Sequence, residues 1–307
     1  MFRTGSNNNF ECDFLEESLH DGVPKNYYYL KDKKFGDWEI APWELFIFNN
    51  RLLGEGSFAK VYLAKWRGTF VVAKVINANI CANEKSLVLR EFDIMTKMHH
   101  PNIVQFLGYI DDPFIIVMEY IPNGDLLQNI EKKTLSKSQK KNIMKDILQG
   151  LAYIHNRRPY SLIHRDIKPT NILLTNSKVA KITDFGLSKF ANIYRNNSND
   201  NLTNLDNRDN NSNYTKLTED LTSFVGTERY MAPESINTTN YSNKVDIYSC
   251  GILLYEMFEN KRYIPNQKMS WYYTPKNIKN IITQNMLSSD PQERLDALNL
   301  LELLNKL

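Results

Sequence analysis

The spacing of the apolar residues changes partway along the chain, near residue 122, and this change limits the folds that the chain can adopt. In the part before it, short runs rich in β-branched and aromatic side chains are separated by turn residues, which is typical of an antiparallel meander. Three such runs lie at 46–53, 61–66 and 70–76. Residues 87–98 have the spacing of a helix, and two more strand-like runs follow it, at 103–109 and 114–120.

Beyond residue 124 the apolar residues recur at helical spacing instead. Ser136 and Gln139 form the pattern of a capping box. The helix predicted after them has an apolar side made of Ile143, Ile147, Leu151 and Ile154. Residues 243–258 are more uniformly apolar and predict a buried helix, and two further helices are predicted around 278–286 and 295–301. Strands therefore precede helices, which indicates the α+β class with two lobes.

We expect residues 1–37 to be an N-terminal extension, partly disordered, because they show no periodicity. The single domain predicted after it covers 38–307, with one lobe at 38–120 and the other at 121–307. Within the second lobe, residues 191–215 are crowded with Asn, Asp and Ser. Such a composition cannot bury enough surface to offset the entropy of ordering, so it predicts a mobile loop.

Composition narrows the class of protein only broadly. The 307 residues are 42% hydrophobic and 24% charged, which indicates a globular chain. We interpreted the basic residues behind the net charge of +3 as scattered, which argues against nucleic acid or an anionic membrane as the main partner. Three distant cysteines, no long apolar run and no signal-peptide pattern in residues 1–20 favour a soluble chain in the cytoplasm, without a membrane span.

Two features of the front half point to phosphate chemistry, and each has an ordinary alternative. The glycines of the segment 54–61, Gly-Glu-Gly-Ser-Phe-Ala-Lys-Val, can bring backbone N–H groups close to phosphate oxygens, but such hairpins are commonly just turns. Lys74 lies in an otherwise apolar strand, where a charge needs a polar cleft or a carboxylate. Glu91 on the following helix is its natural partner; the alternative is a lysine on a solvated strand face.

The segment 164–171, His-Arg-Asp-Ile-Lys-Pro-Thr-Asn, places several polar groups just before an apolar run. Asp166 can accept a proton from a hydroxyl, Lys168 can neutralise a phosphoryl group, and Asn171 can bind a metal through its amide oxygen. Asp184 ends a later apolar strand and is suited to Mg²⁺, which prefers oxygen ligands. Ala-Pro-Glu at 232–234 completes the series.

The ordered set of these motifs resembles the eukaryotic protein kinases, over roughly residues 43–307. The stretches 38–40, 44–45 and 65–69 look like the tyrosine-kinase-like group, whose members mostly phosphorylate Ser and Thr. The resemblance implies a bilobal fold. A small antiparallel β-sheet lobe with one helix would be followed by a larger, mostly helical lobe.

The resemblance also implies roles for individual residues. Lys74 would hold the α- and β-phosphates of ATP and pair with Glu91, while Lys168 would contact the transferred phosphate. Asp166 would be the catalytic base. Asn171 and Asp184 would hold Mg²⁺.

The nucleotide pocket would draw on both lobes. Met118 resembles the gatekeeper, and the backbones of Glu119 and Ile121 would bond the adenine edge. Val61, Val72 and Leu173 would enclose the adenine ring, although all three also suit an ordinary core. The loop over the phosphates would comprise Leu53, Gly54, Glu55, Gly56, Ser57 and Phe58.

The same resemblance implies which hydroxyl groups accept the phosphate and how the activity of the chain is regulated. The triplet 168–170, Lys-Pro-Thr, has the Ser/Thr-kinase form, and Thr227 matches the threonine that bonds the base and the lysine in such kinases. We therefore expect protein substrates with Ser or Thr acceptors. Ser223 lies where many kinases are phosphorylated, by another kinase or by themselves, and its phosphate would pair with Arg165. The alternative is a plain hydroxyl residue in a polar loop.

Some positions depart from the family pattern, and others match residues that have a structural role in the family. Ala59 replaces the usual third glycine, Val72 replaces the usual alanine, and the chain between 256 and 291 is shorter than the family norm. Glu234 with Arg294 resembles a buried ion pair, and Asp246 resembles a brace for the catalytic loop. Two other functions stay open at this point: a pseudokinase acting as a nucleotide-gated scaffold, and a small-molecule phosphotransferase.

Overall fold

The computed structural model describes residues 38–56, 58–77, 82–158, 160–192, 227–237 and 241–306. Our predictions for residues 1–37, Ser57, Ser223 and most of the Asn-rich segment lie outside these residues. The chain divides into two compact units. The first contains the described residues up to His99 together with Val104–Tyr120, and the second contains His100–Ile103 and the described residues from Ile121 on.

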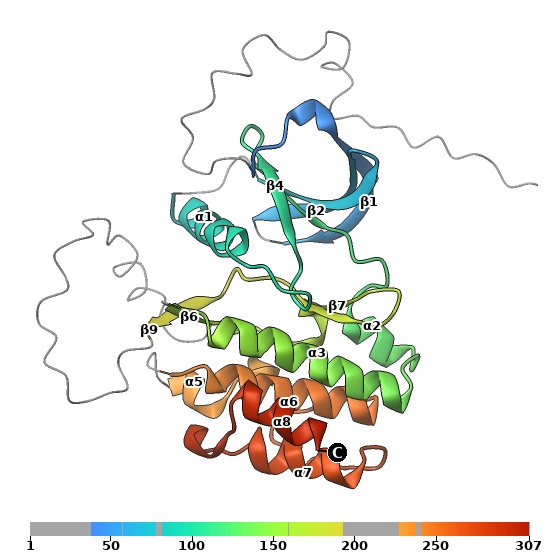
Figure 1. The fold of residues 1–307 in the computed structure, drawn as a ribbon, viewed down its shortest axis with the longest axis vertical. Helices are drawn as coiled ribbons and strands as arrows, with labels where there is room; N and C mark the ends of the chain where they lie inside the picture. Colours follow the sequence, from blue (N-terminus) through green and yellow to red (C-terminus); the bar gives the residue numbers. More distant parts are fainter. Residues whose placement is uncertain are drawn as a thin grey trace, which may run out of the picture. The chain divides into compact units, whose positions relative to one another are not determined.

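The first unit is an antiparallel sheet with one α-helix (Figure 1). The sheet has five strands in the order β1-β2-β3-β5-β4. The predicted meander and helix are present. A short 3-10 helix, η4 (Pro42–Glu44), leads into the sheet. The strands are β1 (Leu45–Glu55), β2 (Ala59–Trp66), β3 (Thr69–Ile76), β4 (Phe106–Ile110) and β5 (Ile115–Glu119), and the helix is α1 (Ala82–Thr96).

The hairpin between β2 and β3 shows how the local sequence fixes the strand register. Trp66 pairs with Thr69, and the two residues between them, Arg67 and Gly68, have φ angles of 46° and 86°. Positive φ at both central residues gives a two-residue turn whose twist matches that of the strands. One face of the sheet then carries the core residues Ile47, Ala64, Val71, Ala73 and Val117.

α1 covers the sheet chiefly through Phe92, which is fully buried. Its ring meets those of Phe106, Tyr109 and Phe114 edge-on, with centroids 5.4, 5.1 and 5.7 Å away.

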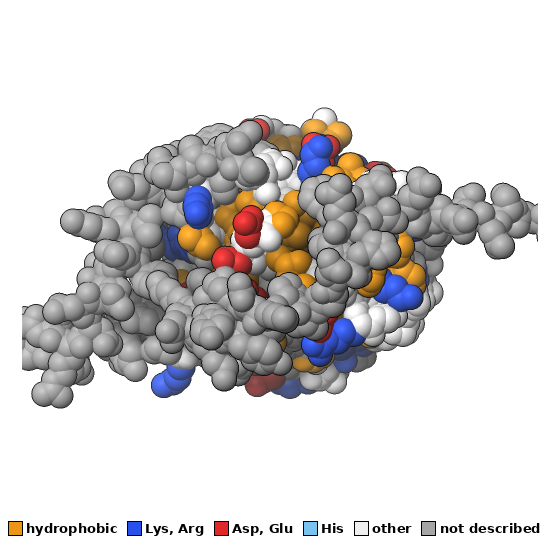
Figure 2. All heavy atoms as spheres, turned by 90° about the horizontal axis from the view of Figure 1, so that it is seen from above, with side chains coloured by type: hydrophobic (Ala, Val, Ile, Leu, Met, Phe, Trp, Pro, Cys, Tyr) orange, Lys and Arg blue, Asp and Glu red, His pale blue; other side chains and the backbone are white. Residues whose placement is uncertain are grey.

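Other apolar side chains of this unit stay at the surface, such as Phe70, which is 53% exposed. Figure 2 shows one face of the molecule, on which apolar side chains lie between charged ones.

The second unit is mostly helical, with two small two-stranded sheets, β6-β9 and β7-β8. Its α-helices are α2 (Leu126–Glu131), α3 (Lys137–His155), α5 (Pro233–Asn237), α6 (Lys244–Glu259), α7 (Lys276–Asn285) and α8 (Ala297–Asn305). Its strands are β6 (Tyr160–Ile163), β7 (Ile172–Leu174), β8 (Ala180–Ile182) and β9 (Lys189–Asn192). The 3-10 helices are η5 (Pro169–Asn171), η7 (Glu228–Tyr230) and η8 (Pro291–Glu293).

The predicted helices of this unit are present. The capping box of α3 is formed, because the Ser136 hydroxyl accepts from the N–H of Gln139 while the Gln139 side chain accepts from the N–H of Ser136. The predicted apolar side of α3 is fully buried. α6 is buried along almost its whole length, as its uniformly apolar sequence predicts, and it packs against α3 and α7.

Two boundaries differ from the sequence prediction. Residues 100–103, which we assigned to the first lobe, belong to the second unit. His100 stacks on Tyr153 at 5.0 Å, and the Asn102 carbonyl accepts from the N–H of Ile182 at 2.8 Å. Residues 191 and 192, expected at the start of a mobile loop, lie in β9 and pair with Ser161 and Tyr160. Ladder bonds use only backbone groups, so a polar sequence does not prevent this pairing.

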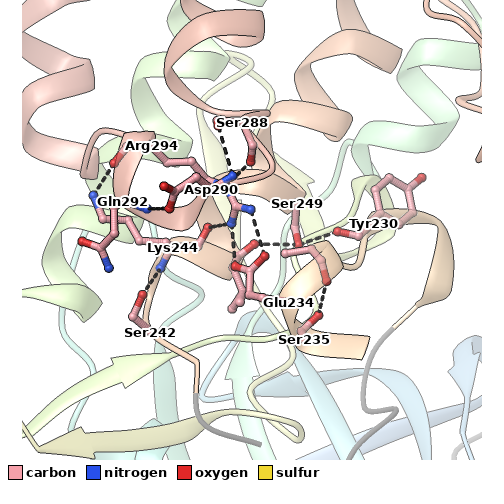
Figure 3. A network of polar contacts seen from close by, with 12 residues as sticks. Tyr230, Glu234, Ser235, Ser242, Lys244, Ser249, Ser288, Asp290, Gln292 and Arg294 are labelled. Atoms are coloured by element: carbon pink, nitrogen blue, oxygen red, sulfur yellow. Dashed lines mark hydrogen bonds and ion pairs between the residues drawn. The ribbon is translucent and has the colours of Figure 1, made fainter. Parts of the chain in front are cut away.

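A buried ion pair joins the end of the chain to the middle of the second unit (Figure 3). Both terminal nitrogens of the Arg294 guanidinium bind the Glu234 carboxylate, at 2.7 and 2.8 Å. Arg294 is only 1% exposed, and it also donates to the carbonyls of Ser288 and Lys244. A buried charge is tolerated when its hydrogen-bonding groups are satisfied in this way. The predicted pairing of these two residues is therefore present.

Glu259, at the end of α6, fixes the backbone of the segment that leads into α7. Its carboxylate accepts from the backbone N–H groups of Tyr272, Tyr273 and Thr274 and from the Thr274 hydroxyl. Burial by itself raises the pKa of this carboxyl, but the four hydrogen bonds to the charged form outweigh it, and the net pKa is lowered.

This lowered pKa predicts how stability depends on pH. A carboxyl with a depressed pKa in the folded state stabilises the fold above its ordinary pKa of 4.5, and this stabilisation is lost as the pH falls through the folded value. We expect Glu259→Gln to lower the free energy of unfolding by about 1–3 kcal/mol at neutral pH. The difference from the wild type should shrink below pH 4.5.

Urea unfolding of both proteins between roughly pH 3 and pH 7 measures this difference, because that range includes the ordinary pKa of a carboxyl group. Glu302→Gln makes the same chemical change at an exposed position and serves as the control. A difference that stays constant over the whole pH range would contradict the prediction.

In the part of the chain that the structure describes, no helix is both long enough and apolar enough to cross a membrane.

Candidate active site

The charged pair predicted in the first unit is formed. Lys74 lies in β3 and Glu91 in α1, and the distance between Lys74 Nζ and Glu91 Oε1 is 2.6 Å. The Lys74 side chain is 19% exposed and that of Glu91 is 8% exposed, so the lysine does not lie on a solvated strand face. The pair keeps a cation in an otherwise apolar strand without leaving its charge unpaired.

Strand register places four of the predicted nucleotide-binding residues on one face of the sheet. Directly paired residues of antiparallel strands lie on the same face, and alternate residues of a strand share a face. Lys74 pairs with Val61, and Val72 pairs with Met118. These four residues therefore lie opposite the core face that carries Val71 and Val117.

The Gly-rich segment forms the hairpin between β1 and β2. Gly54 pairs with Val61, Glu55 pairs with Lys60, and the N–H of Gly56 donates to the carbonyl of Ala59 at 2.9 Å. A Cβ atom built on Gly54 would meet nothing within 4 Å, and one on Gly56 would meet only that carbonyl, at 3.8 Å. Neither packing nor a positive φ therefore requires glycine here. The backbone of this segment is therefore open to the close approach of a ligand such as a phosphate.

The end of β5 is fixed by its neighbour Gln105. The N–H of Glu119 donates to the Gln105 carbonyl at 3.0 Å, and the Glu119 carboxylate accepts from the N–H of Gln105 at 2.7 Å. The N–H of Glu119 is therefore already bonded within the protein. This detail was missed at the sequence level, because it depends on the strand ends.

In the second unit, the loop from His164 to Asn171 is held by a carboxylate from α6. Asp246 is fully buried, and its two oxygens accept from the N–H groups of His164 and Arg165, each at 2.8 Å. His155 Nε2 lies 2.8 Å from Asp246 Oδ2. Burial raises the pKa of the Asp246 carboxyl, but the hydrogen bonds and charges of His155 and His164 outweigh it, so the net pKa is lowered.

Asp166 is the centre of a polar cluster in this loop. Its Oδ1 accepts from the Thr227 hydroxyl at 3.0 Å and from the Thr227 N–H at 3.2 Å. Its Oδ2 accepts from Asn171 Nδ2 at 2.9 Å and lies 2.6 Å from Lys168 Nζ. Lys168 Nζ also donates to the Thr227 hydroxyl at 2.9 Å. The structure thus brings three of the predicted residues together around the carboxylate of a fourth, Asp166.

The two predicted metal ligands, Asn171 and Asp184, lie just before and just after one small hairpin, which is formed by β7 and β8. β7 and β8 are antiparallel, with Ile172 opposite Ile182, so Asn171 and Thr183 flank the same end of the sheet, and Thr183 N–H donates to the Asn171 carbonyl at 3.0 Å. Asp184 comes next and is exposed, with a φ of 66°. Because Asn171 Nδ2 donates to Asp166, its oxygen Oδ1 is left as an acceptor. Two oxygen donors of this kind fit Mg²⁺.

Arg165, the expected partner of a phosphate on Ser223, is already held within the second unit. It has a φ of 70°, a conformation that is rare for non-glycine residues and marks functional loops. Its Nε donates to the Leu187 carbonyl and its Nη1 donates to the Tyr241 hydroxyl at 3.0 Å. Sequence reasoning missed Tyr241 and His155, since neither belongs to a motif.

The brace formed by Asp246 predicts a loss of stability in Asp246→Asn. An amide presents only one acceptor oxygen, so one buried N–H loses its partner, and the substitution should lower the free energy of unfolding by about 2–4 kcal/mol. Chemical denaturation measures it. Asp290→Asn is the matched control, because Asp290 caps η8 at the surface and asparagine caps equally well. Equal stability of the two variants would contradict a bracing role for Asp246.

Comparison with known proteins agrees with this geometry. The family model for the protein kinase domain matches residues 48–306. A serine/threonine-protein kinase named VIK from Arabidopsis thaliana is 39% identical over 73% of this chain and 48% of its own length. The serine/threonine-protein kinase shk2 of Schizosaccharomyces pombe is 36% identical over 68% of this chain and 33% of its own. The chain thus spans about half or less of these curated relatives. It belongs to the protein kinase domain family.

Proposed function

We propose that this chain is a serine/threonine protein kinase, which transfers the γ-phosphate of ATP to Ser or Thr hydroxyls of protein substrates. The observation that carries the proposal is the cluster of Lys168, Asn171 and Thr227 around the Asp166 carboxylate. The names of the relatives, which are serine/threonine-protein kinases, support the choice of acceptor. A cytoplasmic location, where ATP is abundant and cysteines stay reduced, is part of the proposal.

Asp166 would act as the proton acceptor. As the hydroxyl oxygen of the substrate forms its bond to the γ-phosphorus, the bond from that phosphorus to the β-phosphate oxygen breaks and ADP leaves. The hydroxyl proton passes to the Asp166 carboxylate. The Thr227 and Asn171 hydrogen bonds hold the carboxylate in one orientation, which lowers the entropy cost of aligning the acceptor.

The cations and the oxygen donors would neutralise the phosphates. Lys168, bonded to Thr227 and Asp166, would contact the phosphoryl group as it moves. Lys74, oriented by Glu91, would hold the α- and β-phosphates. Asn171 and Asp184 would hold Mg²⁺, which when bound neutralises charge on the phosphate oxygens. The loop residues 53–58 would cover the phosphates with backbone N–H groups.

The adenine would lie against the apolar residues of the same sheet face as Lys74. Val61, Val72 and Met118 share this face through their register, and Leu173 is the further residue proposed to enclose the adenine ring. The backbones of Glu119 and Ile121 would bond the adenine edge.

A transfer assay tests the proposal. We expect Asp166→Asn to lower kcat by on the order of 10²–10⁴-fold, because the proton acceptor is lost, while the affinity for nucleotide stays unchanged. Lys74→Met should lower nucleotide affinity as well. Incorporation of radiolabelled phosphate into a generic protein and binding of a fluorescent nucleotide measure the two quantities. Lys137→Met, at an exposed position at the start of α3, is the control for loss of a lysine.

Two results would contradict the proposal. Nucleotide binding without any transfer by the wild type would indicate a scaffold, and transfer to small molecules alone would indicate a different phosphotransferase. Unchanged transfer in Asp166→Asn would remove that residue from its role.

We also propose that Ser223 is phosphorylated, by the chain itself or by an activating kinase. Ser223 lies four residues before Thr227 and outside the described residues. Phosphorylation would add nearly two negative charges close in sequence to Thr227, and Arg165 is the proposed partner. We expect Ser223→Ala to abolish a phosphate detected by mass spectrometry and to lower the transfer rate, with Ser177→Ala as the control. An unchanged rate and no phosphate in the wild type would refute the idea.

A further inference from the structure

The second unit has a surface that the proposed chemistry does not use, made by the segment between α6 and α7 (Figure 1) and by the start of α7. It combines exposed or partly exposed cations with apolar and aromatic side chains. We call it the basic–aromatic surface, and its residues are Lys261, Arg262, Ile264, Lys268, Trp271, Tyr272, Tyr273, Lys276 and Lys279.

The segment that carries this surface contains no carboxylate of its own, and among its cations Arg262 Nε lies 3.8 Å from the Glu256 carboxylate of α6. Residues 260–289 contain five Lys and Arg and no Asp or Glu. The net charge of the whole chain is +3, so the chain without these five cations carries −2. The expectation that the basic residues are simply scattered therefore does not hold for this segment, which carries five of the 38 Lys and Arg and no acid.

The aromatic side chains of the surface are unusually exposed. Tyr272 is 78% exposed and Tyr273 is 65% exposed, the two highest values among the large hydrophobic residues that the structure describes. Lys261 Nζ lies 5.5 Å from the Tyr255 ring centroid and 5.9 Å from that of Tyr272. Lys279 Nζ lies 5.7 Å from the Trp271 ring. Among these rings that of Tyr272 is exposed, and a cation next to an exposed ring suits a partner that is both acidic and apolar.

The backbone beneath these side chains is fixed, which lowers the entropy cost of binding. Glu259 binds three consecutive N–H groups of residues 272–274. The Tyr255 hydroxyl donates to the Ser270 carbonyl and accepts from the Ser270 N–H, both at 3.3 Å. The rings of Tyr255 and Trp271 meet edge-on at 4.9 Å.

We propose that the basic–aromatic surface binds residues 11–21 of the same chain. This segment, which lies outside the described residues, contains Glu11, Asp13, Glu16, Glu17 and Asp21 and no Lys or Arg. Phe14, Leu15 and Leu19 lie between its acids. Five acids and three apolar residues complement five cations and four apolar or aromatic residues. Attachment to the same chain raises the effective concentration of the segment, so that weak contacts suffice.

Zero-length cross-linking of the full-length chain tests this contact directly. A carbodiimide joins a lysine amine to a carboxylate only when the two touch. We expect cross-links within one chain from residues 11–21 to Lys261, Lys268, Lys276 or Lys279, detected by mass spectrometry. Their yield should fall as salt is added, because exposed charges are screened.

Charge reversal makes the test specific. Lys268→Glu with Lys276→Glu should lower the yield of cross-links from residues 11–21 to the surface roughly tenfold, because like charges then face each other. Both side chains are exposed, and circular dichroism verifies that the fold is kept. The matched control is Lys132→Glu with Lys137→Glu, two exposed lysines around the start of α3, which should leave the yield unchanged.

A charge swap completes the test. Adding Glu16→Lys and Glu17→Lys to the reversed surface should restore cross-links, now between positions 16 or 17 and positions 268 or 276. Adding Glu16→Lys and Glu17→Lys to the control pair should give no cross-links between positions 16 or 17 and positions 132 or 137.

Three results would overturn the proposal. The first is the absence of cross-links between residues 11–21 and the surface at low salt. The second is cross-links only between two copies, shown by mixing ¹⁵N-labelled and unlabelled protein. The third is binding of the surface to vesicles containing phosphatidylserine, lost on charge reversal, while residues 11–21 do not cross-link to it.

Discussion

The second unit depends on one buried carboxylate, that of Asp246. A charged group without water is stable only where hydrogen-bond donors surround it. Here the donors are the backbone N–H groups of His164 and Arg165 together with the His155 ring. Two consecutive N–H groups that bind one carboxylate fix the direction of the chain, and the strained φ of Arg165 is retained because of them. The next residue is Asp166, whose position is therefore set by a group that takes no part in phosphate transfer.

The same principle recurs at other charged positions of the described residues. Arg294 binds Glu234 with both terminal nitrogens, Glu259 collects the N–H groups of a whole turn, and Lys74 is paired with Glu91. In each case a charge removed from water receives several hydrogen bonds or an opposite charge. Such groups order the backbone around them more than they add to stability, because desolvation offsets much of the attraction. They hold in place the loops from which the proposed site and the basic–aromatic surface project.

Much of the fold could be predicted from the sequence, because the signals are local. Strand and helix periods, the capping box of Ser136 and Gln139, and the turn at Arg67 and Gly68 involve residues close together in the chain. The pairing of Lys74 with Glu91 followed instead from the resemblance to protein kinases, because the apolar strand by itself also allowed a lysine on a solvated face. The strand β9 was missed because its ladder bonds to β6 are made by backbone groups, and its composition is that of a loop. Residues 100–103 were assigned to the wrong unit, since only contacts with Tyr153 and Ile182 decide it.

The amino-acid sequence by itself determined which residues are candidates for chemistry, the order in which they occur and the type of most elements, because these depend on motifs and local spacing. Only the tertiary structure decided which groups meet. Thr227 reaches Asp166 across 61 residues, and Asp246 reaches the N–H of His164 across 82. Closing loops of that length costs entropy that the packed helices and paired strands of the whole unit must offset. No pattern within a short window of sequence contains that information.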